Sequence, residues 1–247
     1  MGYQWRRFDR RNMRRRLRSR MESLNIHEAE KYANLVFSDR MERQVLDSML
    51  RLTITRFFRN AWLWTELGAL ITQTGENLVT GDLLRIWSVG CAGGEEPFSL
   101  VMLLDELEKS GRLDQPWSIL GTDTDPASLN RTQAAPYKWG SVREIPAHLL
   151  DRWFTEKDGL WTLDQEIREF VAFKHHDIGS MEPTGRFHLV FLRNSILTYN
   201  TEEIQRKILD RIHHCLLEPG YLVIGRTEKL PDGSQFKEAS RCILKAT

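Results

Sequence analysis

The chain has 247 residues, which allows one large domain or one domain with a smaller companion. Hydrophobic residues make up 41% of it, enough for a substantial core, but no apolar run is long enough to cross a membrane. The net charge of +1 conceals a strongly basic N-terminal segment, and three cysteines show neither metal-type spacing nor evident pairing. A reducing compartment is favoured, and because no apolar signal core follows the basic segment, we expect a cytoplasmic protein.

The basic segment predicts a helix over 6–24. Nine of residues 6–20 are Arg and one is Asp, so the rest of the chain is net acidic. Apolar residues recur there at helical spacing: Met13, Leu17, Met21 and Leu24. The arginines indicate a docking surface for an acidic partner or a solvated helix face. Nucleic acid is disfavoured because no aromatic stacking pattern accompanies the charge.

Three further helices are expected before the first strand. One covers 28–37, a second follows directly, and a third covers 61–72, each with an apolar stripe. The polar stretch 75–81 indicates a linker. We therefore expect a helical domain over 1–74 and an α/β domain over 75–247.

The segment 53–59, Thr-Ile-Thr-Arg-Phe-Phe-Arg, lies between the last two of these helices. Its hydroxyls, guanidinium groups and rings are suited to line a pocket. Phe57 and Phe58 are equally consistent with core positions, so composition alone does not decide.

The segment 83–109 predicts a strand, a glycine turn and a helix. Residues 83–89 are mostly apolar, and three glycines that leave room for a ligand follow: Gly90, Gly93 and Gly94. Glu95 and Glu96 at the helix start would repel a pyrophosphate, and the dinucleotide pattern G-x-G-x-x-G is absent. A neutral or cationic nucleoside ligand fits better. A tight turn with solvated carboxylates is the alternative.

A second strand over 117–122 ends at Asp123-Thr124-Asp125-Pro126, where a helix begins. An acid at this place in a βαβ unit can bind ribose hydroxyls, whereas an acid can also simply cap the helix. We assign Asp123 to a ligand and Asp125 to the cap. From the glycine turn and this acid, the ligand is expected to touch Gly90, Glu95 and Asp123.

The aromatic-rich range 137–169 is expected to form a small inserted subdomain, either a lid or a substrate-facing extension. A third strand over 170–174 ends in His175-His176-Asp177. No third ligand is spaced to join the two histidines, so no metal site is expected.

Further strands are expected over 187–192 and 221–225, separated by a helix over 201–217, with a last strand near 242–244. Arg193 and Asn194 follow the first of these strands. Polar residues at the carboxyl edge of a parallel sheet face the ligand crevice.

Together these segments resemble the chemotaxis receptor methyltransferase (CheR) family, which uses S-adenosylmethionine. The resemblance covers nearly the whole chain. It is carried by four segments in the family's order: 55–59, 87–99, 123–125 and 191–194. It implies an α/β fold, namely a Rossmann-like methyltransferase domain with a mostly parallel sheet, preceded by a small all-helical domain.

The resemblance also implies a pocket for S-adenosylmethionine and its product S-adenosylhomocysteine. Its residues would be Thr53, Thr55, Arg59, Glu95, Asp123, Asp177, Ile178, Arg193 and Asn194. Thr53 and Asp177 replace Asn of the family, and Gly225-Arg226-Thr227-Glu228 replaces Gly-His-Ser-Glu. These departures concern the substrate more than the cofactor.

The implied reaction is methyl esterification of glutamate side chains in a chemoreceptor. Glutamate is ionised at neutral pH, so no strong general base is required. Arg59 and Tyr199 are the candidates for orienting the carboxylate. The implied partner is an acidic protein, a cytoplasmic chemoreceptor helix docking on the arginine-rich helix, with no membrane insertion of the enzyme itself.

Two other hypotheses stay open at this point. One is a methyltransferase of the same fold acting on a small molecule or a non-chemotaxis protein, which the altered segments 225–228 and 197–200 (Leu-Thr-Tyr-Asn, where the family has Ile-Tyr-Phe) motivate. The other is a non-catalytic protein that keeps the nucleoside pocket as a sensor.

Overall fold

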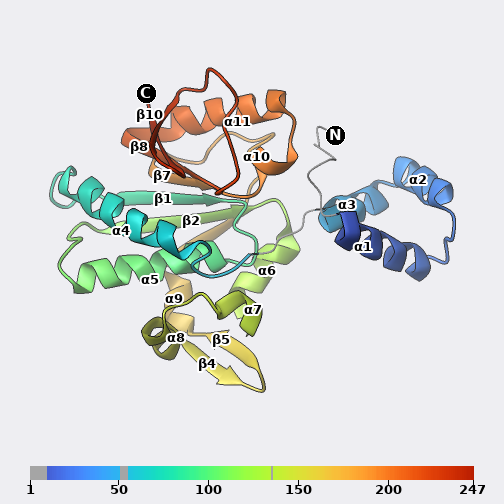
Figure 1. The fold of residues 1–247 in the computed structure, drawn as a ribbon, viewed down its shortest axis with the longest axis horizontal. Helices are drawn as coiled ribbons and strands as arrows, with labels where there is room; N and C mark the ends of the chain where they lie inside the picture. Colours follow the sequence, from blue (N-terminus) through green and yellow to red (C-terminus); the bar gives the residue numbers. More distant parts are fainter. Residues whose placement is uncertain (1–9, 51–54, 135) are drawn as a thin grey trace. The chain divides into compact units, whose positions relative to one another are not determined.

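A computed structural model gives the structure of the protein and describes residues 10–50, 55–134 and 136–247 (Figure 1). The chain divides into two compact units, Met1–Ile54 and Thr55–Thr247. The expected α/β fold, mostly parallel and preceded by helices, is confirmed.

The described part of the first unit contains helices α1 (Arg10–Ser23), α2 (Ala29–Ser38) and α3 (Arg40–Leu50). The buried carboxylate of Glu42 on α3 joins all three. It accepts hydrogen bonds from Nε and Nη2 of Arg20 at 3.0 and 2.6 Å, and from the Tyr32 hydroxyl at 2.8 Å. Arg20 therefore has a structural role, although it lies in the basic segment.

The second unit is built on a seven-stranded sheet with the order β6-β2-β1-β7-β8-β10-β9. Its strands are β1 (Leu84–Val89), β2 (Trp117–Asp123), β6 (Val171–His175), β7 (Phe187–Leu192), β8 (Leu216–Ile224), β9 (Phe236–Ser240) and β10 (Ile243–Ala246). The first five in this order are parallel, and β10 runs antiparallel to both of its neighbours. The order reverses between β1 and β7, which is where sheets of this kind bind ligands.

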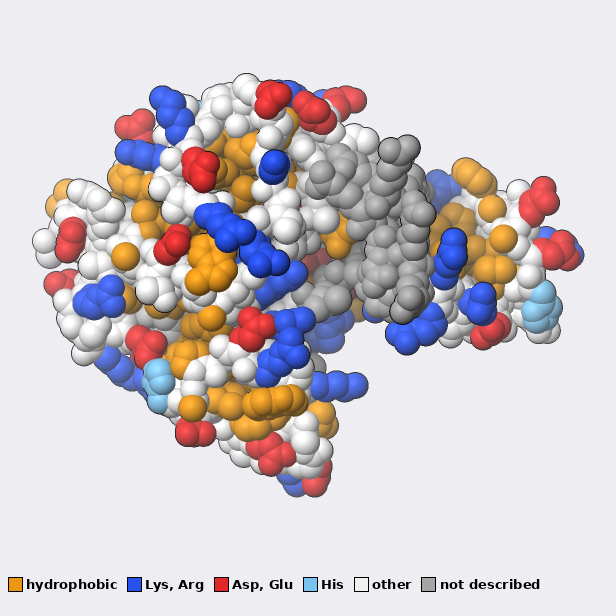
Figure 2. Space-filling model, viewed as in Figure 1, with side chains coloured by type: hydrophobic (Ala, Val, Ile, Leu, Met, Phe, Trp, Pro, Cys, Tyr) orange, Lys and Arg blue, Asp and Glu red, His pale blue; other side chains and the backbone are white. Residues whose placement is uncertain are grey.

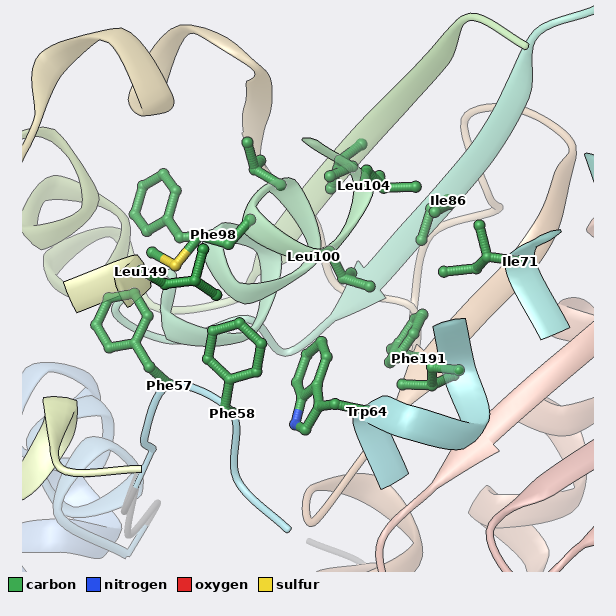
Figure 3. Packing of buried hydrophobic residues seen from close by; sticks show 14 of the residues in the cluster. Phe57, Phe58, Trp64, Ile71, Ile86, Phe98, Leu100, Leu104, Leu149 and Phe191 are labelled. Carbon is green, nitrogen blue, oxygen red and sulfur yellow. The ribbon is translucent and has the colours of Figure 1, made fainter. Parts of the chain in front are cut away.

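Helices cover both faces of the sheet (Figure 1). One face packs against α4 (Ala61–Glu76) and α5 (Glu95–Lys109); Figure 3 shows Ile71 and Leu100 of these helices beside Ile86 and Phe191 of the strands. The opposite face packs against α11 (Glu202–Cys215) and includes Trp87. Because side chains alternate between two buried faces, the central strands are apolar throughout, and all six residues of β7 are buried.

Helix α4 belongs to the second unit, which places the division after Ile54 and not after residue 74 as the sequence-based division had it. Leu67 and Ile71 lie in the same core cluster as Leu100. Gly75, in the last turn of α4, is buried, and a Cβ there would lie 2.8 Å from Cδ1 of Leu113. The polar stretch that follows is thus a connection within one unit, because α4 covers the sheet.

The aromatic-rich range forms a three-stranded sheet with the order β3-β5-β4 and three short helices. Its elements are β3 (Tyr137–Lys138), α7 (Trp139–Val142), α8 (Ala147–Trp153), β4 (Phe154–Lys157), β5 (Leu160–Leu163) and α9 (Gln165–Glu169). We call this part the inserted subdomain. Phe57 packs edge-on against Tyr137 and Phe154, with ring centroids 4.8 and 5.2 Å away.

Within the described ranges, no helix combines the length and apolar character that crossing a membrane would require.

Candidate active site

The glycine turn closes onto the neighbouring strand. The backbone N–H groups of Gly90 and Cys91 both donate to the Thr122 carbonyl, at 2.8 and 2.9 Å. Gly90 and Gly94 have φ of +71° and +87°, the region that favours glycine. A Cβ on Gly94 would also lie 2.6 Å from the ring of Phe98, so the turn needs glycine for space as well as for conformation.

Asp123 fixes this turn from the end of β2. Its Oδ2 accepts from the Ala92 N–H at 2.8 Å, and its Oδ1 accepts from the Asp125 N–H at 2.9 Å. Each oxygen keeps a second lone pair for a ligand hydroxyl. Asp125 accepts from Ala127 and Ser128 at the start of α6 (Pro126–Ala134), so the expected cap is present, and a ligand role for Asp123 stays a prediction.

Glu95, the first residue of α5, is buried instead of solvated. Only 5% of it is exposed, and its Oε2 has no hydrogen-bond partner among the described residues. Burial raises the pKa of Glu95 to about 7, against the opposing effect of a hydrogen bond from the Thr55 side chain. An unsatisfied buried carboxyl oxygen is costly unless a ligand donor meets it.

Glu96, the next residue, is paired with Arg193 at the end of β7. Nη1 of Arg193 lies 2.9 Å from Oε2 of Glu96, and the Ser88 hydroxyl donates to Oε1 at 2.8 Å. Nη2 of Arg193 donates to the Arg59 carbonyl at 2.9 Å and to Oδ1 of Asn60 at 3.1 Å. The Arg193 side chain is 3% exposed, so its guanidinium ties the turn at residues 56–60 to the sheet.

Arg59 and Tyr199 belong to one electrostatic environment. Burial lowers the pKa of Arg59, and the charges of Arg193 and Arg56 lower it further, while Glu96 and Tyr199 raise it. Burial raises the pKa of Tyr199, and the charge of Arg59 opposes this. The structure thus brings the two proposed acceptor-orienting residues within electrostatic reach of each other.

Glu228 is part of the site but was not singled out in the sequence. Its Oε2 accepts from the backbone N–H groups of Asn194 and Gly225 at 2.8 and 2.7 Å, and its Oε1 from the Thr198 hydroxyl at 2.5 Å. It thereby holds Asn194, at φ of +54°, and helix α10 (Ile196–Tyr199), which carries Tyr199. The only signal was its place at the end of the segment 225–228.

Asp177 and Ile178 follow β6, the strand beside β2. Both oxygens of Asp177 accept locally, from the Gly179 N–H and the Ser180 hydroxyl, each at 2.9 Å. Ile178 is 3% exposed and lies in the core cluster that contains Trp87. Their expected contacts with a cofactor stay predictions, and Thr53 lies outside the described residues.

No three His, Cys, Asp or Glu side chains of the described ranges are grouped so as to hold a metal ion. Nε2 of His176 lies 2.9 Å from the Glu182 carbonyl oxygen, and its backbone N–H donates to the Asp123 carbonyl at 3.1 Å.

A doubly wound sheet, a glycine turn at its reversal point and carboxylates in place of a phosphate cradle define a nucleoside-binding α/β domain. Residues 53–243 match the model of the "CheR methyltransferase, SAM binding domain". The protein belongs to the CheR methyltransferase family, and S-adenosylmethionine is the cofactor of its matched domain.

Individual relatives agree with this family. The chain is 32% identical over 239 residues to chemotaxis protein methyltransferase 1 of Pseudomonas aeruginosa, covering 93% of this chain and 86% of that protein. It is 32% identical over 212 residues to chemotaxis protein methyltransferase Cher2 of Pseudomonas putida, covering 83% and 76%. An uncharacterized 104.1 kDa protein of Rhodobacter capsulatus is also 32% identical over 87% of this chain, which spans only 23% of that protein.

Among solved structures, the glycopeptide N-methyltransferase MtfA complexed with sinefungin is 12% identical, with a TM-score of 0.41. The match covers 75% of this chain and 60% of that one.

The residues present fit S-adenosylmethionine. Three buried polar atoms around the turn have no hydrogen-bond partner among the described residues: Oε2 of Glu95, Nε of Arg193 and Oγ of Ser195. Gly90 lies beside Ser195, with φ of +71°, and a Cβ added to it would be 3.5 Å from the Cβ of Ser195. Asp123 would hold ribose hydroxyls, and Glu95 would meet a further donor of the cofactor.

Proposed function

We propose that this protein transfers a methyl group from S-adenosylmethionine to glutamate side chains of a chemoreceptor, forming carboxyl methyl esters. The observation that carries the proposal is that Arg59 lies in a turn held by Arg193, the partner of Glu96 at the glycine turn, and within electrostatic reach of Tyr199. A guanidinium and a phenol hydroxyl are both donors, and both suit an anionic oxygen acceptor. The names of the Pseudomonas relatives support the chemotaxis setting.

The main task of the protein in this reaction is to align the acceptor oxygen with the methyl group. When bound, the cofactor supplies a methyl group on a sulfonium, and ester formation makes a C–O bond as a C–S bond breaks. The glutamate carboxylate arrives ionised, so no residue needs to accept a proton. Arg59 and Tyr199 would hold one carboxylate oxygen in line with the C–S bond, and such orientation can contribute several kcal/mol.

The proposed partner surface is the exposed part of α1. Arg14, Arg15 and Arg18 are exposed there, and Figure 2 shows basic side chains on the surface of this unit. An acidic helix of the receptor's cytoplasmic region would complement them, which would place the reaction in the cytoplasm. Arg10 and Arg11 were expected in the same surface, but their side chains lie outside those described.

The test uses methyl-labelled S-adenosylmethionine and a purified cytoplasmic fragment of a chemoreceptor. We expect labelled protein from which mild alkali releases methanol. Tyr199→Phe should lower kcat by roughly ten-fold or more because it removes one hydrogen bond to a charged group. Arg59→Ala should cost more, with part of the loss in cofactor binding.

Three outcomes would contradict the proposal. Alkali-stable label on a nitrogen would show a different acceptor chemistry. Label confined to small molecules in a cell extract would favour the alternative that the altered segments 197–200 and 225–228 motivate. Binding of S-adenosylhomocysteine without any transfer would favour a sensor.

A further inference from the structure

Glu144, in the inserted subdomain between α7 and α8, contacts both ends of the turn that carries Arg59. Its Oε1 lies 2.8 Å from Nη1 of Arg56, and its Oε2 accepts from the backbone N–H of Asn60 at 3.3 Å. One carboxylate thus bridges the residues that begin and end the turn. Arg59 lies between them, one residue before Asn60.

The turn has a conformation that needs outside support. Phe58 and Asn60 have φ of +48° and +67°, which non-glycine residues rarely adopt. Its backbone donors are met by other elements: Phe57 N–H by the Ser141 carbonyl and Phe58 N–H by the Ser99 hydroxyl, both at 3.0 Å. Arg193, at the end of β7, donates a hydrogen bond from Nη2 to the Arg59 carbonyl of the same turn.

The inserted subdomain also contacts the glycine turn of the candidate site. The Tyr137 hydroxyl donates to the Gly93 carbonyl, in the glycine turn, at 3.0 Å. The Tyr137 ring packs edge-on against Phe57 of the Arg59 turn. The same small subdomain therefore braces both the turn that receives the cofactor and the turn that carries Arg59.

We propose that Glu144 is a positioning residue for methyl transfer, which fixes Arg59 through the Asn60 backbone and the Arg56 guanidinium. This rests on the proposed function, in which Arg59 orients the acceptor carboxylate. It also gives the inserted subdomain a task within the reaction, apart from any contact with the acceptor. Glu144 itself touches no reacting atom.

The Glu144–Arg56 pair is too exposed for a large effect on folding. The two side chains are 27% and 31% exposed, and pairs of this kind contribute little to stability. Misplacement of a group that aligns the acceptor is felt strongly in turnover. The consequence of losing Glu144 should therefore appear in kcat and not in the melting temperature.

The chain offers a matched control in Arg152 of α8. It forms a two-point ion pair with Asp105 of α5, at 2.6 and 3.0 Å, with side chains 36% and 19% exposed. This pair also joins the inserted subdomain to the main body. It does not touch the Arg59 turn.

The experiment compares Glu144→Gln with Arg152→Ala in the full chain, using labelled S-adenosylmethionine and the receptor fragment. Glu144→Gln should lower kcat about ten-fold and leave the Tm unchanged, and any loss of affinity for S-adenosylhomocysteine should be smaller than that of Arg59→Ala. Arg152→Ala should leave all three unchanged. Arg56→Gln should lower kcat as well, and the double variant should be no slower than Glu144→Gln alone. Wild-type kcat in Glu144→Gln, or an equal loss in Arg152→Ala, would overturn the proposal.

A second readout does not depend on turnover. Amide hydrogen exchange at residues 57–60 should be faster in Glu144→Gln than in the wild type, and unchanged in Arg152→Ala. Equal exchange in all three proteins would overturn the positioning role. If the wild type transfers no methyl group to the receptor fragment, the proposed function fails while this measurement still decides whether Glu144 holds the turn.

Discussion

Glu95 is a carboxyl group that the fold removes from water. Burial raises its pKa from 4.5 to about 7. Between pH 4.5 and about 7 the folded protein keeps a proton that the unfolded chain has lost. The free energy of unfolding should therefore fall as pH rises through this window, by on the order of 3 kcal/mol in total.

We expect Glu95→Gln to relieve this penalty because glutamine has no proton to lose. The gain in unfolding free energy over the wild type should be small at pH 5 and largest at pH 8, as measured by urea unfolding. Glu108→Gln, an exposed carboxylate on the same helix, serves as the control and should act equally at both pH values. A gain for Glu95→Gln that does not change with pH would contradict a buried acid at this position.

Single residues differ in how much the sequence says about them. Asp125 was predicted as a helix cap from its place before Pro126, and local chain geometry alone suffices for that. The pairing of Glu96 with Arg193 joins residues 97 positions apart, so no local pattern indicates it. Glu228 is the same case: a lone acid acquires its three donors only when β7, α10 and β8 have come together.

Helix α5 depends on glycine at both of its ends, and for different reasons. Gly94 before it and Gly111 after it have φ of +87° and +65°. A Cβ at Gly94 would lie 2.6 Å from Phe98 and 3.2 Å from Thr132, whereas one at Gly111 would meet nothing within 4 Å. Substitution at Gly111 therefore tests backbone strain alone, whereas substitution at Gly94 tests backbone strain together with steric overlap.

Gly111→Ala should destabilise the protein by about 1 kcal/mol, from backbone strain alone. Gly94→Ala should cost roughly 1–3 kcal/mol more, because Phe98 must move within a packed core. Urea unfolding of both variants measures the difference. Gly140→Ala is the control, since φ there is not positive and the space is open. Equal losses of unfolding free energy in Gly94→Ala and Gly111→Ala would contradict this prediction, because they would show that Phe98 moves aside at no cost.

The elements that the sequence revealed are those with strong patterns. The expected strands at the centre of the sheet were found because burial on both faces makes them continuously apolar, as β7 shows. The strands β3, β4 and β5 were missed because they have only two to four residues, most of which are exposed. Strand β9 was missed because three of its five residues are exposed and its burial shows no alternation.

At the scale of the whole molecule, the apolar stripe of α4 predicted a helix but not the core that it covers. Packing with α5 decides that question, and the residues of α5 lie well downstream. The ligand contacts of Thr55, Asp123, Asp177 and Asn194 stay predictions, because they depend on a partner that the chain does not contain.

The arginines of α1 are not equivalent in the structure. Arg14 and Arg18 are exposed, whereas Arg20 pairs with the buried Glu42. If the exposed ones dock an acidic receptor, Arg14→Gln with Arg18→Gln should raise KM for the receptor fragment about ten-fold at low salt. Affinity for S-adenosylhomocysteine should stay the same. The wild-type KM should rise with salt because exposed charges are screened over about 8 Å at physiological ionic strength.

Arg112→Gln, an exposed arginine of the second unit, is the control for net charge and should leave KM unchanged. Arg20→Gln should behave differently from all of these, lowering stability by leaving a buried carboxylate without its cation. If KM does not change with salt concentration, the docking role is contradicted and the exposed arginines form a solvated helix face.

Strand β10 lies between β8 and β9, although it follows both in the chain. During synthesis on a ribosome, β8 therefore emerges with one open edge, and β9 emerges with no neighbour at all. The seven-stranded sheet cannot be completed until residues 243–246 have left the exit tunnel and paired with both β8 and β9. Within this sheet, the strand made last is the one that joins β9 to the rest, so a nascent chain stalled before it would expose the unpaired edge of β8 to pairing with other chains.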